Sequence, residues 1–190
     1  MSNIQILQED GPQPALWDEW EVPAQSPFRE TRPLRDHPSR RRMMKMAAYV
    51  LRFFPELACQ TIEVGITRGA EGRALVGEPR IWLNPRGLCH HTIAHELIHV
   101  LQGRDDIPSG ERSCDVYSLA RDHTLVDARP AYLQLPDGAF DARRRPLPGV
   151  PSLLTRLARE AIERRRLGNR RYITWFENEV WRTVKGSLFR

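Results

Sequence analysis

The chain has 190 residues, 41% of them hydrophobic and 28% charged, which are ordinary proportions for one soluble globular domain. Its formal net charge of +5 favours acidic partners such as nucleic acid, although the same charge also keeps an ordinary protein soluble. Three cysteines without a C-x-x-C pair argue against a disulfide framework or a thiolate zinc knuckle. The first residues do not resemble a signal peptide and no apolar run approaches a membrane span, so we expect a cytoplasmic protein without a membrane segment.

Residues 1–40 are predicted to form a proline-rich N-terminal arm. Proline removes a backbone hydrogen-bond donor and disfavours helix, so this stretch should be extended. Trp17 and Trp20 interrupt it, and we expect them to dock the arm onto the rest of the protein, because disordered segments contain few aromatic residues. The prolines that define the arm are Pro12, Pro14, Pro23, Pro27, Pro33 and Pro38.

Residues 41–127 are predicted to form the catalytic core, which begins with one helix and two strands. The helix starts near Arg40 and is ended by Pro55, with an apolar stripe at Met43, Met46, Ala47, Val50, Leu51 and Phe54. Alternation of apolar with polar or small residues predicts a half-buried strand over 62–66. The composition of Arg80–Asn84 predicts a second strand. Between the two strands lies a turn region marked by Gly69, Gly72 and Gly77.

The second half of the chain is predicted to be mainly helical. One helix should span about 91–102 and another about 109–126. Residues 128–150 are rich in Pro, Gly and Arg and should form a connecting loop. Residues 151–190 should form a C-terminal cap of two helices, with apolar stripes at Leu153, Leu154, Leu157, Ala158, Ala161 and Ile162, and at Ile173, Phe176, Val180 and Val184.

The segment His95-Glu96-Leu97-Ile98-His99 carries the chemistry. Residues four apart lie on the same face of a helix, so the imidazoles of His95 and His99 can bind one zinc ion. Glu96 lies about 100° around the helix, beside the metal, where it can act as a general base toward a zinc-activated water. The opposite face is apolar and should anchor the helix in the core through Ile93, Leu97, Val100 and Leu101.

A catalytic zinc needs a third protein ligand, and Glu111 and Asp115 share a face of the next predicted helix. Their Glu-x-x-x-Asp pattern resembles the second zinc motif of the gluzincin metallopeptidases, the clan of thermolysin. The resemblance implies that Glu111 is the third ligand and that Asp115 orients a ligand histidine, which agrees with the usual histidine–carboxylate contact at zinc sites. The alternative ligand is Asp105, six residues after His99, although the glycine that such motifs need is one place late, at Gly103.

Residues 60–126 resemble the pared-down gluzincins called minigluzincins, and their order of elements is similar to that of SprT-like intracellular zinc peptidases. The resemblance implies an α+β, zincin-like fold with a small sheet, a catalytic HExxH helix, a Glu-bearing helix and C-terminal capping helices. It also implies that the strand at 80–84 forms the upper rim of the cleft and pairs its edge with an extended peptide through Ile81, Trp82 and Leu83. The alternative is that this strand is an ordinary interior strand.

Several polar residues beside these motifs are compatible with more than one role. His91, His95 and His99 cannot all reach one tetrahedral ion, because the outer pair is about 12 Å apart on a straight helix, so we expect His91 at the cleft or the surface. Nothing in the sequence selects an oxyanion-stabilising side chain among Tyr117, His123 and Tyr132. Two cysteines near the motifs are interpreted as small core residues, Cys89 and Cys114.

The motifs together predict a zinc metalloendopeptidase that uses Zn²⁺ to hydrolyse a peptide or protein substrate. A further hypothesis is that the two ends of the chain fold over the cleft and keep the enzyme latent. One alternative is a DNA-associated protease, recruited by the arginine runs at 40–42, 143–145, 164–166 and 170–171. Another alternative is a non-catalytic protein stabilised by zinc, which would need a closed site with four ligands.

Overall fold

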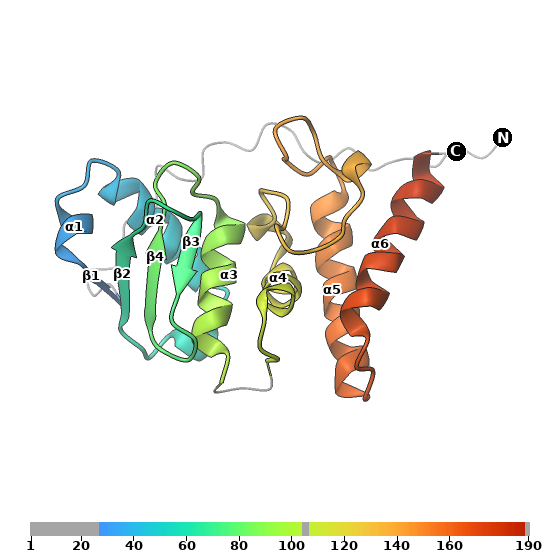
Figure 1. Ribbon diagram of the computed structural model, residues 1–190, viewed down its shortest axis with the longest axis horizontal. Coiled ribbons are helices and arrows are strands. Elements are labelled where there is room, and N and C mark those ends of the chain that lie inside the picture. The colour runs from blue at the N-terminus through green and yellow to red at the C-terminus, as the bar shows by residue number, and fades with distance from the viewer. Residues whose placement is uncertain (1–26, 104–106, 189–190) are drawn as a thin grey trace.

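The computed structural model describes residues 27–103 and 107–188. It confirms the α+β fold class, with a small mixed sheet and helices. Figure 1 shows the sheet at one end, followed side by side by α3 (His90–Leu101), α4 (Glu111–Leu119), α5 (Val150–Arg166) and α6 (Tyr172–Leu188). None of the described helices is both long and apolar enough to cross a bilayer. The residues expected to dock the arm, Trp17 and Trp20, lie outside the described residues.

The sheet has the strand order β1-β2-β4-β3. β1 (Phe28–Glu30), β2 (Ile62–Ile66) and β4 (Arg80–Leu83) are parallel, whereas the short β3 (Gly72–Ala74) runs antiparallel to β4. Both predicted strands are therefore confirmed. The prediction misses β1, which lies in the proline-rich region, and β3, which lies in the glycine-rich turn region.

The position of β4 contradicts the expectation that this strand offers its edge to a peptide. β2 pairs with one edge of β4 and β3 with the other, so the backbone groups of both edges are already bonded. Ile81 and Leu83 are buried in the core, and Trp82 lies on the opposite face of the sheet, over Gly65. The expectation that Ile81, Trp82 and Leu83 pair their strand edge with a peptide is therefore wrong, because β4 is an interior strand.

The first hydrophobic core lies between the sheet, α2 (Arg40–Leu51) and α3. Val64 and Ile81 of the sheet and Ile93 and Leu97 of α3 are almost completely buried there. The predicted stripe of α2 is confirmed by Met43, Ala47 and Val50, which are fully buried. Every residue of α3 is buried, because this helix packs against the sheet on one side and against α4 on the other.

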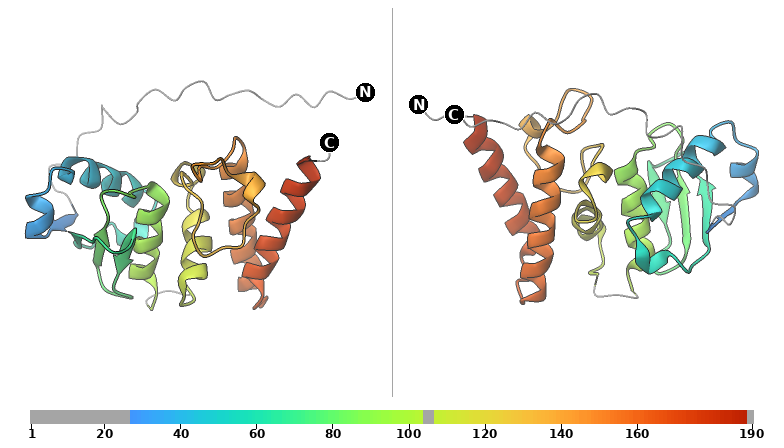
Figure 2. Two further views of the ribbon diagram at one scale, coloured as in Figure 1. Left: turned by 45° about the horizontal axis from the view of Figure 1, so that its top comes forward. Right: turned by 180° about the vertical axis from the view of Figure 1, so that it is seen from behind.

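The second hydrophobic core lies between α4, α5 and α6 and confirms the two C-terminal stripes. Leu154 and Ala161 of α5 meet Phe176 and Val180 of α6 and Val116 of α4 in one buried cluster. α4 therefore separates the two cores and contributes to both. Figure 2 shows α5 and α6 on the side of α4 that faces away from α3.

Two element boundaries differ from the prediction. α4 ends at Leu119, and a 3-10 turn (His123–Leu125) follows instead of further α-helix. Asp122 begins this turn, because its carboxylate accepts hydrogen bonds from the backbone N–H and hydroxyl of Thr124 and so competes with helix continuation. At the other end, β1 and the short α1 (Arg32–Arg35) lie within the region predicted to be an extended arm.

Candidate functional site

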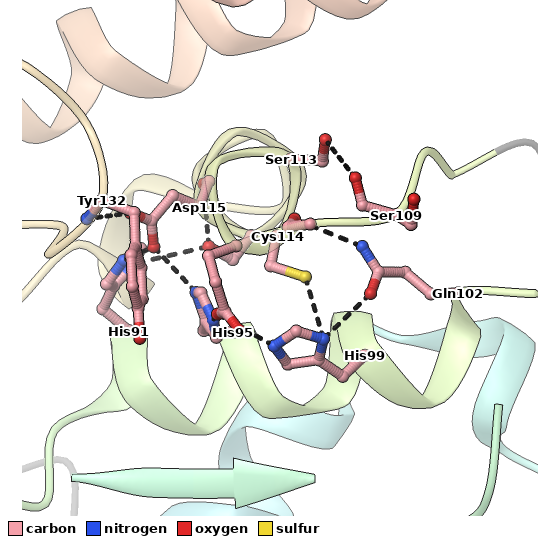
Figure 3. Close-up of polar contacts among 12 residues, drawn as sticks. His91, His95, His99, Gln102, Ser109, Ser113, Cys114, Asp115 and Tyr132 are labelled. Atoms are coloured by element: carbon pink, nitrogen blue, oxygen red, sulfur yellow. Dashed lines mark hydrogen bonds and ion pairs between the residues drawn. The ribbon is translucent and has the colours of Figure 1, made fainter. Parts of the chain in front are cut away.

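The candidate site lies between α3 and α4. Figure 3 shows His91, His95 and His99 along the side of α3 that faces Cys114 and Asp115 of α4. Both faces predicted for the HExxH helix are therefore present, with the apolar face in the first core and the histidine face toward α4.

Local hydrogen bonds fix the start of the histidine helix. The Asp127 carboxylate accepts the backbone N–H groups of His90 at 2.8 Å and of His91 at 3.0 Å. Cys89 caps the same end through its sulfur, which accepts the N–H of Thr92. These groups satisfy donors that a helix N-terminus otherwise leaves unpaired, and the carboxylate complements the helix dipole.

Asp115 sets the orientation of His95. Its Oδ1 lies 2.8 Å from His95 Nδ1 and 3.2 Å from His91 Nε2, and its Oδ2 accepts the backbone N–H of Tyr132 at 2.9 Å. Burial raises the pKa of Asp115, but hydrogen bonds from His91 and His95 outweigh it, and the pKa lies well below its usual value. The group is therefore an ionised acceptor, so His95 carries its hydrogen on Nδ1 and its lone pair on Nε2.

Gln102 sets the orientation of His99 in the same way. The amide Nε2 of Gln102 donates to the carbonyl of Pro108 at 2.7 Å, which turns its Oε1 toward His99 Nδ1 at 2.9 Å. The amide oxygen can only accept, so Nδ1 of His99 carries the hydrogen and Nε2 carries the lone pair. Gln102 is 1% exposed, so water does not compete for this bond.

The two lone pairs converge on one carboxylate oxygen. Glu111 Oε2 lies 2.9 Å from His95 Nε2 and 3.2 Å from His99 Nε2. Lone pairs and a carboxylate oxygen at these distances repel one another, so a cation must lie between them, either a proton on the imidazole Nε2 or a metal ion. Ligand atoms 2.0–2.1 Å from a tetrahedral zinc ion are about 3.4 Å apart, close to these separations. Two imidazoles and a carboxylate at these separations form a donor set that could hold a zinc ion.

The electrostatics of His95 agree with that fit. Burial lowers the pKa of its imidazole. Hydrogen bonds to Asp115 and Glu111 and the charges of Asp115 and Glu96 raise it by more, so the pKa of His95 lies above its ordinary value. The surroundings of this ring therefore favour a positive charge, whether that charge is a proton or a metal ion.

Two groups of three side chains in the described residues have ligand atoms that all lie within 4.8 Å of one another, and Glu111 belongs to neither. His95 and His99 come together with Cys114, and His91 and His95 come together with Asp115. Cys114 Sγ lies 3.3 Å from Nδ1 of His99, on the opposite side of the ring from Glu111, and burial raises the pKa of this thiol, which disfavours the thiolate that metals bind. Asp115 already accepts three hydrogen bonds. The chemistry of these donors therefore favours Glu111 over Cys114 and Asp115 as the third candidate ligand.

Glu96 lies beside these ligands rather than among them. Its carboxyl group packs against Gly72 of β3, where an added Cβ would lie only 2.8 Å from Glu96 Cγ. Its Oε2 is buried and has no hydrogen-bond partner among the described residues. Burial raises the pKa of Glu96 to about 7, the nearby His95 lowers it and Glu111 raises it. A buried, unpaired carboxylate oxygen with this pKa is suited to accept a proton near neutral pH.

A cavity of about 240 Å³ opens next to Glu96 and His95. Its lining comes from β3 and the residues before it, from α3, from Asp115 and from residues 128–132. Tyr132 is 49% exposed at this cavity, and its ring stacks on His95 with a centroid distance of 5.5 Å. Neither α5 nor α6 lines the cavity, so the C-terminal helices do not cover it, whereas residues 1–26, the other end in the latency hypothesis, lie outside the described residues.

The structure brings together most of the residues that the sequence singles out. His95, Glu96, His99, Glu111 and Asp115 all meet at this site. The alternative ligand Asp105 lies outside the described residues.

Two further contacts were not predicted, that of His91 with Asp115 and that of Gln102 with His99. Tyr132 is the one residue among the three oxyanion candidates that lines the cavity. The short spacing between His99 and Gln102 is the one local signal that could have revealed such a contact, because residues three apart are neighbours on a helix.

No protein family model, curated protein or solved structure matches this chain.

Proposed function

We propose that this protein is a zinc-dependent endopeptidase with His95, His99 and Glu111 as metal ligands. The observation that carries the proposal is the convergence of two imidazole lone pairs and a carboxylate oxygen, each imidazole fixed from behind by an acceptor. The α+β fold is compatible with the proposed zincin-like fold, and the resemblance of the motifs to minigluzincins and SprT-like peptidases supports the proposal, as does the unpaired Glu96 oxygen beside the ligands.

Each residue has a defined task in this proposal. When bound, zinc supplies a Lewis acid that polarises the substrate carbonyl and lowers the pKa of water. Glu96 accepts the proton of the attacking water and passes it to the leaving amine. Asp115 and Gln102 hold the two imidazoles in the tautomer that leaves Nε2 free.

Tyr132 is the candidate for stabilising charge on the substrate carbonyl oxygen. Its ring lies against His95, and burial together with the charges of Glu111, Asp115 and Glu96 raises the pKa of its hydroxyl. The hydroxyl therefore stays protonated, and can donate a hydrogen bond, in the pH range near 7 in which Glu96 ionises.

In this proposal the substrate peptide binds along the edge of β3. Among the described strands it pairs with β4 alone, so its other edge carries unpaired backbone groups. Gly72 of β3 lines the cavity and touches Glu96. An extended peptide that adds to this edge would pass beside Glu96.

Zinc titration against a competing chelator tests the ligand set. The wild type should bind one zinc ion, and His95→Ala or His99→Ala should abolish tight binding. Glu111→Gln should weaken it by about 100-fold, because a carboxylate contributes charge as well as a donor atom. His123→Ala is the control, because its side chain is 58% exposed on the turn after α4. Unchanged affinity in all three ligand variants would refute the proposed metal site.

The DNA-associated alternative remains a prediction with weaker support. Within the arginine runs, Arg40 pairs with Glu30, Arg145 with Asp141, and others pair within α5. Such pairs are typical of solvated helix ends and loops. A mobility shift on duplex or single-stranded DNA that weakens steeply with salt would favour this alternative.

The non-catalytic alternative conflicts with the surroundings of Glu96. A structural zinc site is closed by four protein ligands. Here the nearest thiol, Cys114, faces the nitrogen of His99 that points away from Glu111, and a cavity opens beside the ligands. An open position next to an unpaired base is what catalysis requires.

A further inference from the structure

The loop that carries Tyr132 at the cavity, residues 132–134, is hydrogen-bonded to α6. The backbone N–H of Gln134 donates to Glu177 Oε1 at 2.8 Å, and the carbonyl of the same residue accepts from Trp181 Nε1 at 2.9 Å. On the other side, the N–H of Tyr132 donates to Asp115. The backbone of residues 132–134 is therefore bonded to α4 at one point and to α6 at two points.

Glu177 is an unusual residue for this position, because it is a carboxylate only 6% exposed on the face of α6 that packs into the second core. Burying a charge is costly unless hydrogen bonds compensate for it. Its second oxygen accepts from Arg112 Nη2 at 2.6 Å, and Arg112 follows Glu111 directly on α4. Both partners of this buried acid thus belong to, or adjoin, the proposed catalytic site.

From these contacts we infer that Glu177 is a positioning residue that holds Tyr132 against His95. The inference rests on the proposed function for its catalytic consequence. Tyr132 is two residues from the bonded Gln134, and its ring is half exposed at the cavity, with His95 stacked on one side. Without the bonds to α6, the backbone of residues 132–134 would keep its hydrogen bond to Asp115, and Leu133 would remain buried in the second core. The α5–α6 hairpin is therefore part of the catalytic unit and not a removable cap.

A double-mutant cycle between Glu177 and Tyr132 tests the inference by kinetics. Glu177→Ala should lower kcat about 10-fold with little change in KM and zinc affinity, because the ligands stay in place while Tyr132 loses its position. Tyr132→Phe should lower kcat about 100-fold, as loss of an oxyanion donor does. In the Tyr132→Phe background, Glu177→Ala should cost almost nothing further. Equal losses in both backgrounds would overturn the inference, because they would show a general structural role.

Hydrogen exchange gives a second readout that does not depend on activity. Glu177→Ala should accelerate exchange of the Gln134 and Tyr132 amides at least 10-fold, whereas Glu179→Ala should not, because Glu179 pairs with Arg182 of the same helix. Trp181→Phe serves if Glu177→Ala does not fold. It removes the N–H bond to Gln134 from a residue that is 38% exposed, and it should show a smaller acceleration.

The two readouts separate failure of this inference from failure of the proposed function. Suppose that exchange is accelerated in Glu177→Ala but no form of the protein cleaves a substrate. Glu177 would then hold the loop that carries Tyr132, and the catalytic role of Tyr132 would be wrong. Unchanged exchange in Glu177→Ala and in Trp181→Phe would show that α6 does not hold this loop, whatever the wild type cleaves.

Discussion

Gly72 of β3 and Glu96 of α3 are in direct contact, and a side chain at position 72 would occupy the space of the carboxyl group. An added Cβ would lie 2.8 Å from Cγ and 2.9 Å from Cδ of Glu96. Position 72 therefore couples the edge strand, where a peptide is proposed to bind, to the proposed general base.

Replacing Gly72 should impair catalysis without removing the metal. Gly72→Ala should reduce kcat by about 10- to 100-fold, because the methyl group displaces the carboxylate by a fraction of an ångström to an ångström. Zinc affinity should stay within about 2-fold of the wild type, because no ligand is touched. Gly69→Ala is the matched control, since no atom lies within 4 Å of its added Cβ. Equal activity of the two variants would contradict a role for this contact.

Asp115 should contribute to zinc affinity although it is not a ligand. Asp115→Asn should weaken zinc binding about 10- to 100-fold, because the ionised acceptor of His95 Nδ1–H is replaced by a neutral amide. The measurement is a zinc competition assay. Asp36→Asn is the control, because its carboxylate lies on the surface, 74% exposed. An unchanged dissociation constant in Asp115→Asn would show that His95 needs no partner.

Gln102 should support His99 in the same manner. Gln102→Leu removes the acceptor for His99 Nδ1–H at nearly constant volume and should weaken zinc binding about 10-fold. Gln102→Glu keeps an acceptor oxygen at the same distance along the side chain and should retain more affinity than Gln102→Leu. The reverse order in a competition titration would contradict the assigned orientation of the amide.

Glu96 should make the metal-free protein less stable as the pH rises. Its pKa is about 7 in the folded protein against 4.5 ordinarily, so the folded state binds the proton more tightly than the unfolded state. The free energy of unfolding should therefore be highest below pH 4.5 and should fall by roughly 3 kcal/mol in total as the pH rises to about 7. Urea unfolding in the presence of a chelator should show this slope in the wild type, and Glu96→Gln should flatten it. Parallel pH profiles of the two proteins would count against a raised pKa.

Local patterns predicted the elements whose residues form the cores. The apolar stripes of α2, α5 and α6 and the alternation in β2 were sufficient, because each element buries a face that its own periodicity defines. The histidine face of α3 followed from the same rule, since two histidines four apart must share a face.

Contacts between distant segments could not be predicted in this way. β4 is interior and β3 forms the edge because β3, within the connection at 67–79, pairs with β4. This strand is only Gly72–Ala74, which is too short to show a periodic pattern. The partners of Glu177 lie 43 and 65 residues away in the sequence, and no periodicity reports them. Such contacts are set by how the two cores pack around α4.

The most direct test of the account is cleavage of an unfolded protein by the wild type and by Glu96→Gln, with zinc content measured in the same samples. We expect one zinc ion per chain in both proteins and cleavage by the wild type alone, with at least a 100-fold difference in rate. Equal cleavage by both proteins, or no zinc in the wild type, would contradict it.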